Sequence, residues 1–273
     1  MDALLRNARR KLSQGLLFWR EAGEGIPIVL LHGNWHESSQ WVGVMESLAK
    51  DFNCFAPDLL GFGESENPNI HYSIDLQVEC IAEFLQALKL ERVYLVGHSL
   101  GGWVAASYAL KYPEQVDKLV LLAPEGVKIP GQEADWSKMQ KLVKRSPLWF
   151  KILRSLRFLT KIFGLHEKIE QDWQTRQKVL QFPTACQLLF QRQQPEIEAE
   201  LLQNRLPEIE IPVLILQGGK DSPDALTRSE VYSKLIPEVE LRMIAHAGND
   251  LPESCVGVVA GDLRDFVLNY GKI

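Results

Sequence analysis

Residues 92–110 read RVYLVGHSLGGWVAASYAL, which is a short apolar run, a glycine-flanked serine and then a pattern typical of a helix. Ser99 lies between Gly97 and Gly101, in the order Gly-x-Ser-x-Gly. A serine at a tight strand-to-helix turn can hold a strained backbone only where its neighbours are small, and the turn lifts its hydroxyl above the sheet. The stretch therefore predicts a nucleophilic serine at the end of a strand, the alternative being a tight turn around an inert serine.

The same alternation of strand and helix recurs along the chain. Residues 73–90 carry an apolar stripe with helical spacing, and Ser73 can cap the start of that helix. Repeated strand-helix pairs predict an α/β protein with a mostly parallel central sheet flanked by helices. The expected strands are residues 27–31, 53–56, 92–96, 118–122, 212–216 and 239–244.

The alternation breaks over residues 126–206, which carry helical patterns and no convincing strand. We expect an inserted helical cap there, with residues 1–125 and 207–273 forming the core. Because ligands of such sheets bind beyond the carboxyl ends of the strands, a helical insertion at that end would act as a lid.

Three motifs in order resemble the α/β-hydrolase superfamily. LLHGNWHESSQW (residues 30–41) resembles its His-Gly oxyanion loop and DLLGFGES (residues 58–65) its glycine turn; both precede the serine. The resemblance covers nearly the whole chain and implies an inserted lid and a Ser-Asp-His triad. It also implies an oxyanion hole formed by the backbone N–H groups of Asn34 and Leu100.

The acid of such a triad is expected at Asp221. LILQGGKDS (residues 214–222) resembles the family's strand, glycine turn and aspartate. The carboxylate would orient an imidazole and stabilise its charged form. Glu125, after the preceding strand, occupies the place where some members of the fold keep the acid instead.

The base is less clearly placed, because the family's histidine position falls on Asn249 in IAHAGNDLP. In one interpretation, the small residues of this loop let His246 turn towards Ser99. In a second, Asn249 occupies the base position, naturally or through a deliberate substitution, and leaves a nearly inactive hydrolase or a ligand-binding protein. In a third, water or another group serves as base for a different reaction.

Residues 138–164 contain eight Lys or Arg and no acid. From Leu148 on, apolar and basic side chains alternate as on an amphipathic helix, with Trp149, Ile152, Leu153, Leu156, Leu159 and Phe163 on the apolar face. Such a helix either makes weak contact with a membrane surface or packs its apolar face on the rest of the lid. Both interpretations favour a small hydrophobic acyl substrate.

The composition of the chain argues against several functional classes and indicates its location. The formal net charge of −5 argues against nucleic-acid binding. Four scattered cysteines (Cys54, Cys80, Cys186 and Cys255) indicate neither a zinc site nor a disulfide framework and favour a cytoplasmic location. No run is long enough for a signal peptide or a membrane span.

The sequence thus predicts a serine hydrolase that cleaves a hydrophobic carboxylic ester through an acyl-enzyme on Ser99, with Asp221 and His246 completing the triad and no cofactor or metal. A serine at position 99 argues against the dehalogenase and epoxide-hydrolase chemistries of the family, which use a carboxylate nucleophile. The alternative is a catalytically impaired binding protein of the same fold.

Overall fold

The computed structural model describes residues 4–129, 133–155 and 166–269. The chain divides into two compact units, one of residues 1–129 and 200–273 and the other of residues 130–199. The second unit lies within residues 126–206, the segment expected to be an inserted cap. That this unit acts as a lid stays a prediction.

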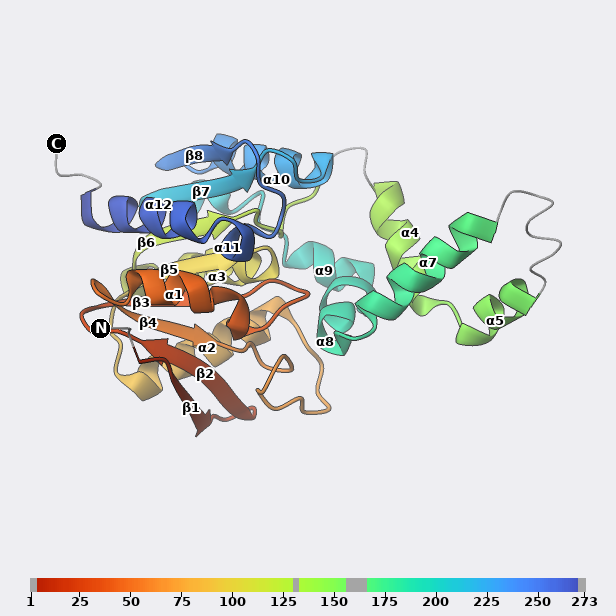
Figure 1. Ribbon diagram of the computed structural model, residues 1–273, viewed down its shortest axis with the longest axis horizontal. Coiled ribbons are helices and arrows are strands. Elements are labelled where there is room, and N and C mark those ends of the chain that lie inside the picture. Colours follow the sequence, from red (N-terminus) through yellow and green to blue (C-terminus); the bar gives the residue numbers. More distant parts are fainter. Residues whose placement is uncertain (1–3, 130–132, 156–165, 270–273) are drawn as a thin grey trace. The chain divides into compact units, whose positions relative to one another are not determined.

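The larger unit is built on an eight-stranded sheet of order β1-β2-β4-β3-β5-β6-β7-β8 (Figure 1). Strands β4, β3, β5, β6, β7 and β8 pair in parallel with their neighbours. Strands β1 and β2 form an antiparallel hairpin at one edge, and β2 also pairs antiparallel with β4. The strands are β1 (Arg6–Lys11), β2 (Leu16–Ala22), β3 (Ile26–Leu31), β4 (Phe52–Pro57), β5 (Val93–His98), β6 (Val116–Leu122), β7 (Val213–Gly218) and β8 (Val239–Ile244). The mostly parallel sheet is confirmed, and all six expected strands are present.

The hairpin of β1 and β2 was not expected. Five of the six residues of β1 are exposed, so the strand lacks the alternation of apolar and polar residues that marks a half-buried strand. In β2, by contrast, Leu17, Phe18 and Trp19 are buried. An edge strand rich in charged residues resists pairing with other chains.

Helices cover both faces of the sheet. Helices α1 and α12 pack together on one face, and α2 and α3 on the other (Figure 1). Ser73 caps α2 as expected, because its Oγ accepts a hydrogen bond from Leu76 N at 3.0 Å. The helices of this unit are α1 (Val42–Leu48), α2 (Ile74–Leu88), α3 (Leu100–Lys111), α10 (Pro223–Leu235), α11 (Leu251–Ser254) and α12 (Val256–Asn269), with short 3₁₀ turns at Ser38–Trp41, Pro113–Gln115 and Leu206–Glu208.

The smaller unit is helical in its described residues. Its helices are α4 (Glu133–Lys144), α5 (Pro147–Ser155), α7 (His166–Val179), α8 (Pro183–Cys186), a π-helical turn at Gln187–Gln191 and α9 (Gln194–Ala199). Trp149 and Ile152 of the predicted apolar face are exposed on α5, whereas Phe150, which is not part of that face, is buried. Leu156, Leu159 and Phe163 of that prediction lie outside the described residues. Within the described residues, no helix has the length and apolar character needed to cross a membrane.

Candidate active site

Ser99 occupies the turn between β5 and α3. Its backbone angles are φ 52° and ψ −112°, a conformation that costs a non-glycine residue about 1–3 kcal/mol unless the surroundings enforce it. Two backbone hydrogen bonds enforce it here, because Ser99 N donates to Leu122 O at 2.9 Å and Ser99 O accepts from Glu125 N at 3.1 Å. The predicted strained turn is therefore present.

The glycines around Ser99 are required by close backbone packing. A Cβ at Gly97 would lie 2.2 Å from Gly101 O, and one at Gly101 would lie 2.4 Å from Leu31 O. Neither oxygen can move without disturbing β3 or α3. The glycines thus let the start of α3 sit directly against the sheet.

The hydroxyl of Ser99 faces an amide and a carboxylate. Its Oγ lies 2.9 Å from Asn34 Oδ1 and 3.3 Å from Glu125 Oε1. Asn34 Nδ2 donates to the same carboxylate oxygen at 3.3 Å, which fixes the orientation of the amide, since the reverse would turn Asn34 Oδ1 towards a negative charge. The Ser99 hydroxyl therefore lies within hydrogen-bonding distance of Glu125, which the sequence predicts only as an alternative position of the acid.

Two backbone N–H groups near Ser99 remain available. Within the described part of the chain, neither Asn34 N nor Leu100 N donates to a protein acceptor. Leu100 is the first residue of α3, and the N–H groups at the start of a helix attract negative charge. Both groups could therefore serve as the donors of an oxyanion hole.

Asp221 is paired with Asn249. Asn249 Nδ2 donates to Asp221 Oδ2 at 2.9 Å. Gln217 Nε2 lies 3.2 Å from the same oxygen, and Ser222 N donates to Asp221 Oδ1 at 2.6 Å. The Asp221 carboxylate thus accepts a hydrogen bond from the Asn249 amide, whereas a Ser-Asp-His triad predicts a hydrogen bond from an imidazole at this place.

The structure does not bring His246 to Ser99. His246 is exposed, and its Nε2 lies 3.9 Å from Cys255 Sγ. The loop that carries it is held to the end of β7, because Gly219 N donates to Ile244 O and Lys220 N donates to Ala247 O. These bonds bury Ala247 and turn the adjacent imidazole outwards, so the small residues of the loop do not give it the freedom that the sequence suggested.

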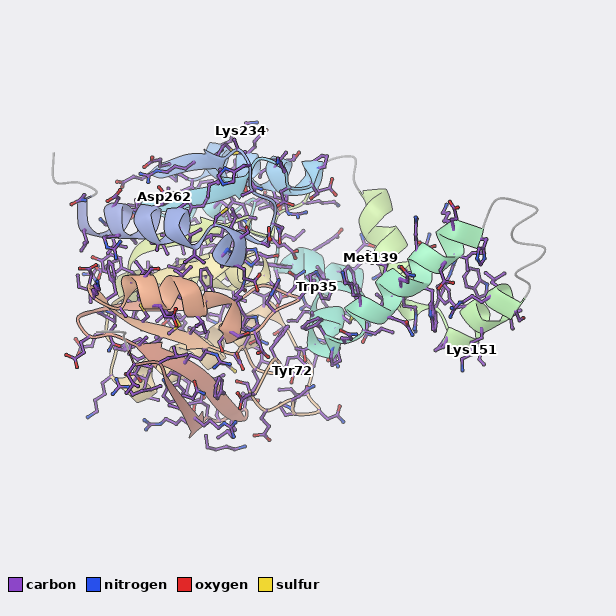
Figure 2. The ribbon with its side chains drawn as sticks, in the orientation of Figure 1. Trp35, Tyr72, Met139, Lys151, Lys234 and Asp262 are labelled. Atoms are coloured by element: carbon purple, nitrogen blue, oxygen red, sulfur yellow. The ribbon has the colours of Figure 1, made fainter. Side chains whose placement is uncertain are left out.

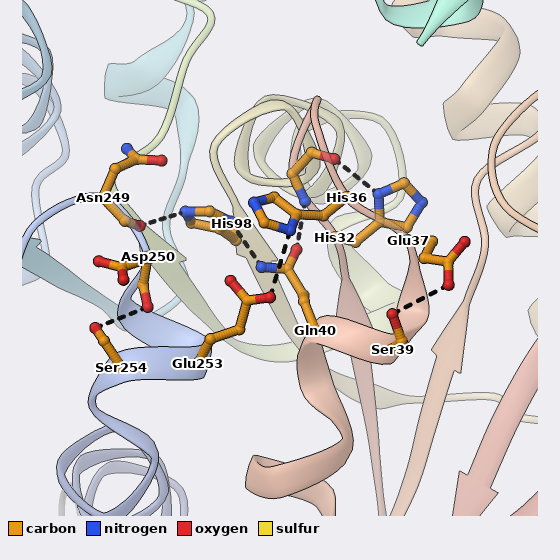
Figure 3. Close-up of polar contacts among 11 residues, drawn as sticks. His32, His36, Glu37, Ser39, Gln40, His98, Asn249, Asp250, Glu253 and Ser254 are labelled. Atoms are coloured by element: carbon orange, nitrogen blue, oxygen red, sulfur yellow. Dashed lines mark hydrogen bonds and ion pairs between the residues drawn. The ribbon is translucent and has the colours of Figure 1, made fainter. Parts of the chain in front are cut away.

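His98 connects the loop of Asn249 to the residue before the nucleophile. His98 Nε2 donates to Asn249 O at 2.8 Å, and its Nδ1 accepts from Gln40 Nε2 at 3.1 Å (Figure 3). Burial lowers the pKa of His98 to about 4, so the ring is neutral near pH 7. His98 therefore positions the Asn249 backbone and has no nitrogen left to accept the Ser99 proton.

His32 supports the loop that carries Asn34. Its Nδ1 donates to Gly33 O at 2.8 Å, and its Nε2 accepts from Leu59 N at 3.0 Å. Burial lowers the pKa of this imidazole. Both ring nitrogens are thus used in shaping the loop.

Asp58 accepts hydrogen bonds from the backbone N–H groups of Ser38 and Glu64 at 2.6 and 2.7 Å. It therefore acts as a turn residue. Among the described residues, no three His, Cys, Asp or Glu side chains gather as a metal site requires.

The family model described as "alpha/beta hydrolase fold" matches residues 26–253, which include every residue of this site. The chain belongs to the α/β-hydrolase family. The match covers most of the core and the whole of the smaller unit.

Curated relatives of this α/β-hydrolase match it over part of their length. An uncharacterized protein of Mycobacterium tuberculosis is 44% identical over 109 residues, covering 40% of this chain and 32% of that protein. The 2-hydroxymuconate semialdehyde hydrolase of Pseudomonas sp. is 39% identical over 123 residues, covering 42% and 44%. The 1-acylglycerol-3-phosphate O-acyltransferase ABHD5 of Rattus norvegicus is 36% identical over 142 residues, covering 50% and 39%. The matches thus span less than half the length of these relatives.

Solved structures match nearly the whole α/β-hydrolase chain. Cfl2 of Burkholderia cenocepacia is 26% identical with a TM-score of 0.71 and coverage of 96% of this chain and 95% of that one. The 2-hydroxy-6-oxo-6-phenylhexa-2,4-dienoate hydrolase of a Rhodococcus strain is 21% identical with a TM-score of 0.75 and coverage of 97% and 99%. The latter likeness concerns the fold alone.

Proposed function

We propose that this chain is a serine hydrolase that cleaves hydrophobic carboxylic esters through an acyl-enzyme on Ser99, with Glu125 as proton acceptor. One observation carries the proposal: the Ser99 hydroxyl, held in a strained turn, lies 3.3 Å from the Glu125 carboxylate. A relative named as a hydrolase supports hydrolysis, and one named as an acylglycerol-phosphate acyltransferase supports an acyl substrate.

The proposed reaction begins with attack of Ser99 Oγ on the ester carbonyl carbon. The hydroxyl proton passes to Glu125 Oε1, and the carbonyl oxygen takes up negative charge. The N–H groups of Asn34 and Leu100 donate to this oxyanion; one such donor is typically worth about 3 kcal/mol of transition-state stabilisation. Collapse expels the alkoxide, which takes the proton from Glu125, and water then cleaves the acyl-enzyme by the same steps.

A carboxylate is a weaker base than an imidazole at neutral pH, so this arrangement predicts slow turnover. Asp221 does not contact Ser99; it holds the Asn249 amide. The proposed enzyme therefore works without the imidazole that the family places between acid and nucleophile.

A second candidate is a non-catalytic binding protein. The observation that favours it is the shorter hydrogen bond of the Ser99 hydroxyl, which goes to the neutral amide of Asn34 at 2.9 Å. An amide oxygen does not accept the proton as a base near neutral pH, so a hydroxyl confined to that bond would stay inert.

Hydrolysis of p-nitrophenyl esters from acetyl to octanoyl separates the two candidates. We expect slow turnover that favours the longer acyl chains and is lost in Ser99→Ala. Glu125→Gln should lower kcat by about 10²-fold or more, whereas the matched control His246→Asn should leave it unchanged. Full activity in Glu125→Gln would contradict the assigned base, and ester binding without turnover would support the binding protein.

A further inference from the structure

Helix α5 carries an apolar surface that faces solvent. The exposed fractions of Leu148, Trp149 and Ile152 are 66%, 40% and 59%. On the opposite side of the same helix Phe150 is fully buried, with its ring centroid 5.4 Å from that of Trp173.

Helix geometry explains this division. Successive residues are turned by about 100°, so Leu148 and Ile152 project almost directly away from the direction of Phe150. The smaller unit already has its anchor for α5 in Phe150. The outward residues therefore form a separate surface, here called the α5 patch and defined as Leu148, Trp149 and Ile152.

Basic residues lie next to the α5 patch in the sequence, and one of them contacts it. Residues 139–155 include five Lys or Arg and no Asp or Glu, in a chain whose net charge is −5. Lys144, Arg145 and Lys151 are exposed, and the Arg145 guanidinium lies 4.2 Å from the ring centroid of Trp149. Figure 2 labels Lys151 on α5. Arg154 lies 3.0 Å from Glu170 and is neutralised within the unit.

We propose that the α5 patch and the basic residues around it bind an anionic lipid surface. An exposed tryptophan and two aliphatic side chains beside Lys and Arg have the chemistry of a helix that lies in a membrane interface. Basic residues near such a surface gain from the negative potential of anionic headgroups. Pairing of two copies through this patch is disfavoured, because a two-fold interface would place the same positive side chains against each other.

Vesicle sedimentation of the full chain tests this proposal independently of catalysis at Ser99. We expect the protein to pellet with phosphatidylcholine vesicles containing about one third phosphatidylglycerol and to stay in solution with phosphatidylcholine alone. Binding should weaken as the salt concentration rises from about 0.1 M to about 1 M.

Two variants separate the apolar and the electrostatic contributions. Leu148→Ser with Ile152→Ser should weaken partitioning at least about tenfold, because the apolar contact is lost. Lys144→Gln with Lys151→Gln should weaken it about fivefold for each charge removed. Val258→Ser, which changes an apolar residue 43% exposed on α12, is the matched control and should leave binding unchanged.

Three outcomes would overturn the proposal. The first is that the protein does not pellet with anionic vesicles at low salt. The second is that it pellets equally well with and without the side chains of the α5 patch. The third, from sedimentation velocity, is self-association that Leu148→Ser with Ile152→Ser abolishes while vesicle binding is absent, which would assign the patch to a second copy of the chain.

Discussion

Replacing Asn249 by histidine should convert the slow site into a fast one. The Nδ2 of asparagine and the Nδ1 of histidine are separated from Cβ by the same number of bonds, so Nδ1 of an imidazole at position 249 can donate to Asp221 Oδ2 as the amide does at 2.9 Å. That bond fixes the tautomer in which Nε2 is free to accept a proton. The bond from His98 to Asn249 O, 2.8 Å long, holds the backbone in place for the new ring.

The expected size of this gain follows from the role of the base. General-base catalysis typically contributes about 10²–10⁴-fold, which lowers the barrier by about 3–5 kcal/mol. We expect Asn249→His to raise kcat for p-nitrophenyl butyrate within this range, and Asp221→Asn in the same protein to remove most of the gain.

The control is Asn249→Gln, which keeps an amide and should not raise the rate. A correctly folded Asn249→His that turns over no faster than the parent would refute the assignment of position 249 as the vacant base position. A parent whose kcat already matches that of complete triads would refute it equally.

Three further predictions concern pH and packing. Because an imidazole titrates near pH 6.5 and a carboxylate lower, the rate of the parent should show no inflection near pH 6.5, whereas Asn249→His should acquire one; an inflection in the parent would point to a histidine base. Burial lowers the pKa of His98 to about 4, so the unfolded chain binds more protons below pH 6.5 and the free energy of unfolding should fall on acidification. The His98 contribution is roughly 2 kcal/mol between pH 7 and pH 5. In urea titrations at several pH values, the free energy of unfolding of His98→Gln should therefore fall less steeply on acidification than that of the parent. Gly101→Ala should lower the free energy of unfolding by about 1–3 kcal/mol because its Cβ meets backbone oxygens, whereas Gly257→Ala on α12, with open space around it, should raise it by about 0.5–1 kcal/mol; equal effects would contradict the packing argument.

The sheet could be predicted because its central strands are buried runs. All six residues of β7 are buried, and such a run between turn residues marks a strand. The hairpin of β1 and β2 could not be predicted in the same way, because the exposed side chains of β1 carry no periodic signal. Its position depends on pairing with β2, which only the folded chain shows.

The candidate site was predictable where backbone strain selects the residues. The strained turn at Ser99 needs small neighbours, so Gly97 and Gly101 predict it from the sequence. The partners of its hydroxyl were not predictable from spacing, because Asn34 and Glu125 follow different strands and meet only at the carboxyl edge of the sheet.

The misplaced residue was His246. The small residues of its loop favour an arrangement in which His246 turns towards the nucleophile. The carbonyl groups of Ile244 and Ala247 accept hydrogen bonds from the turn after β7, and these bonds fix the loop. Because they join backbone groups, the amino-acid sequence does not predict them.

The most direct test of the central claim is mass spectrometry of the protein after treatment with a fluorophosphonate. If Ser99 is a nucleophile with a carboxylate at its hydroxyl, one adduct should form on Ser99, be absent from Ser99→Ala and form more slowly in Glu125→Gln. A Ser99 that stays unmodified after prolonged exposure to excess reagent, or an adduct on another residue, would contradict the account.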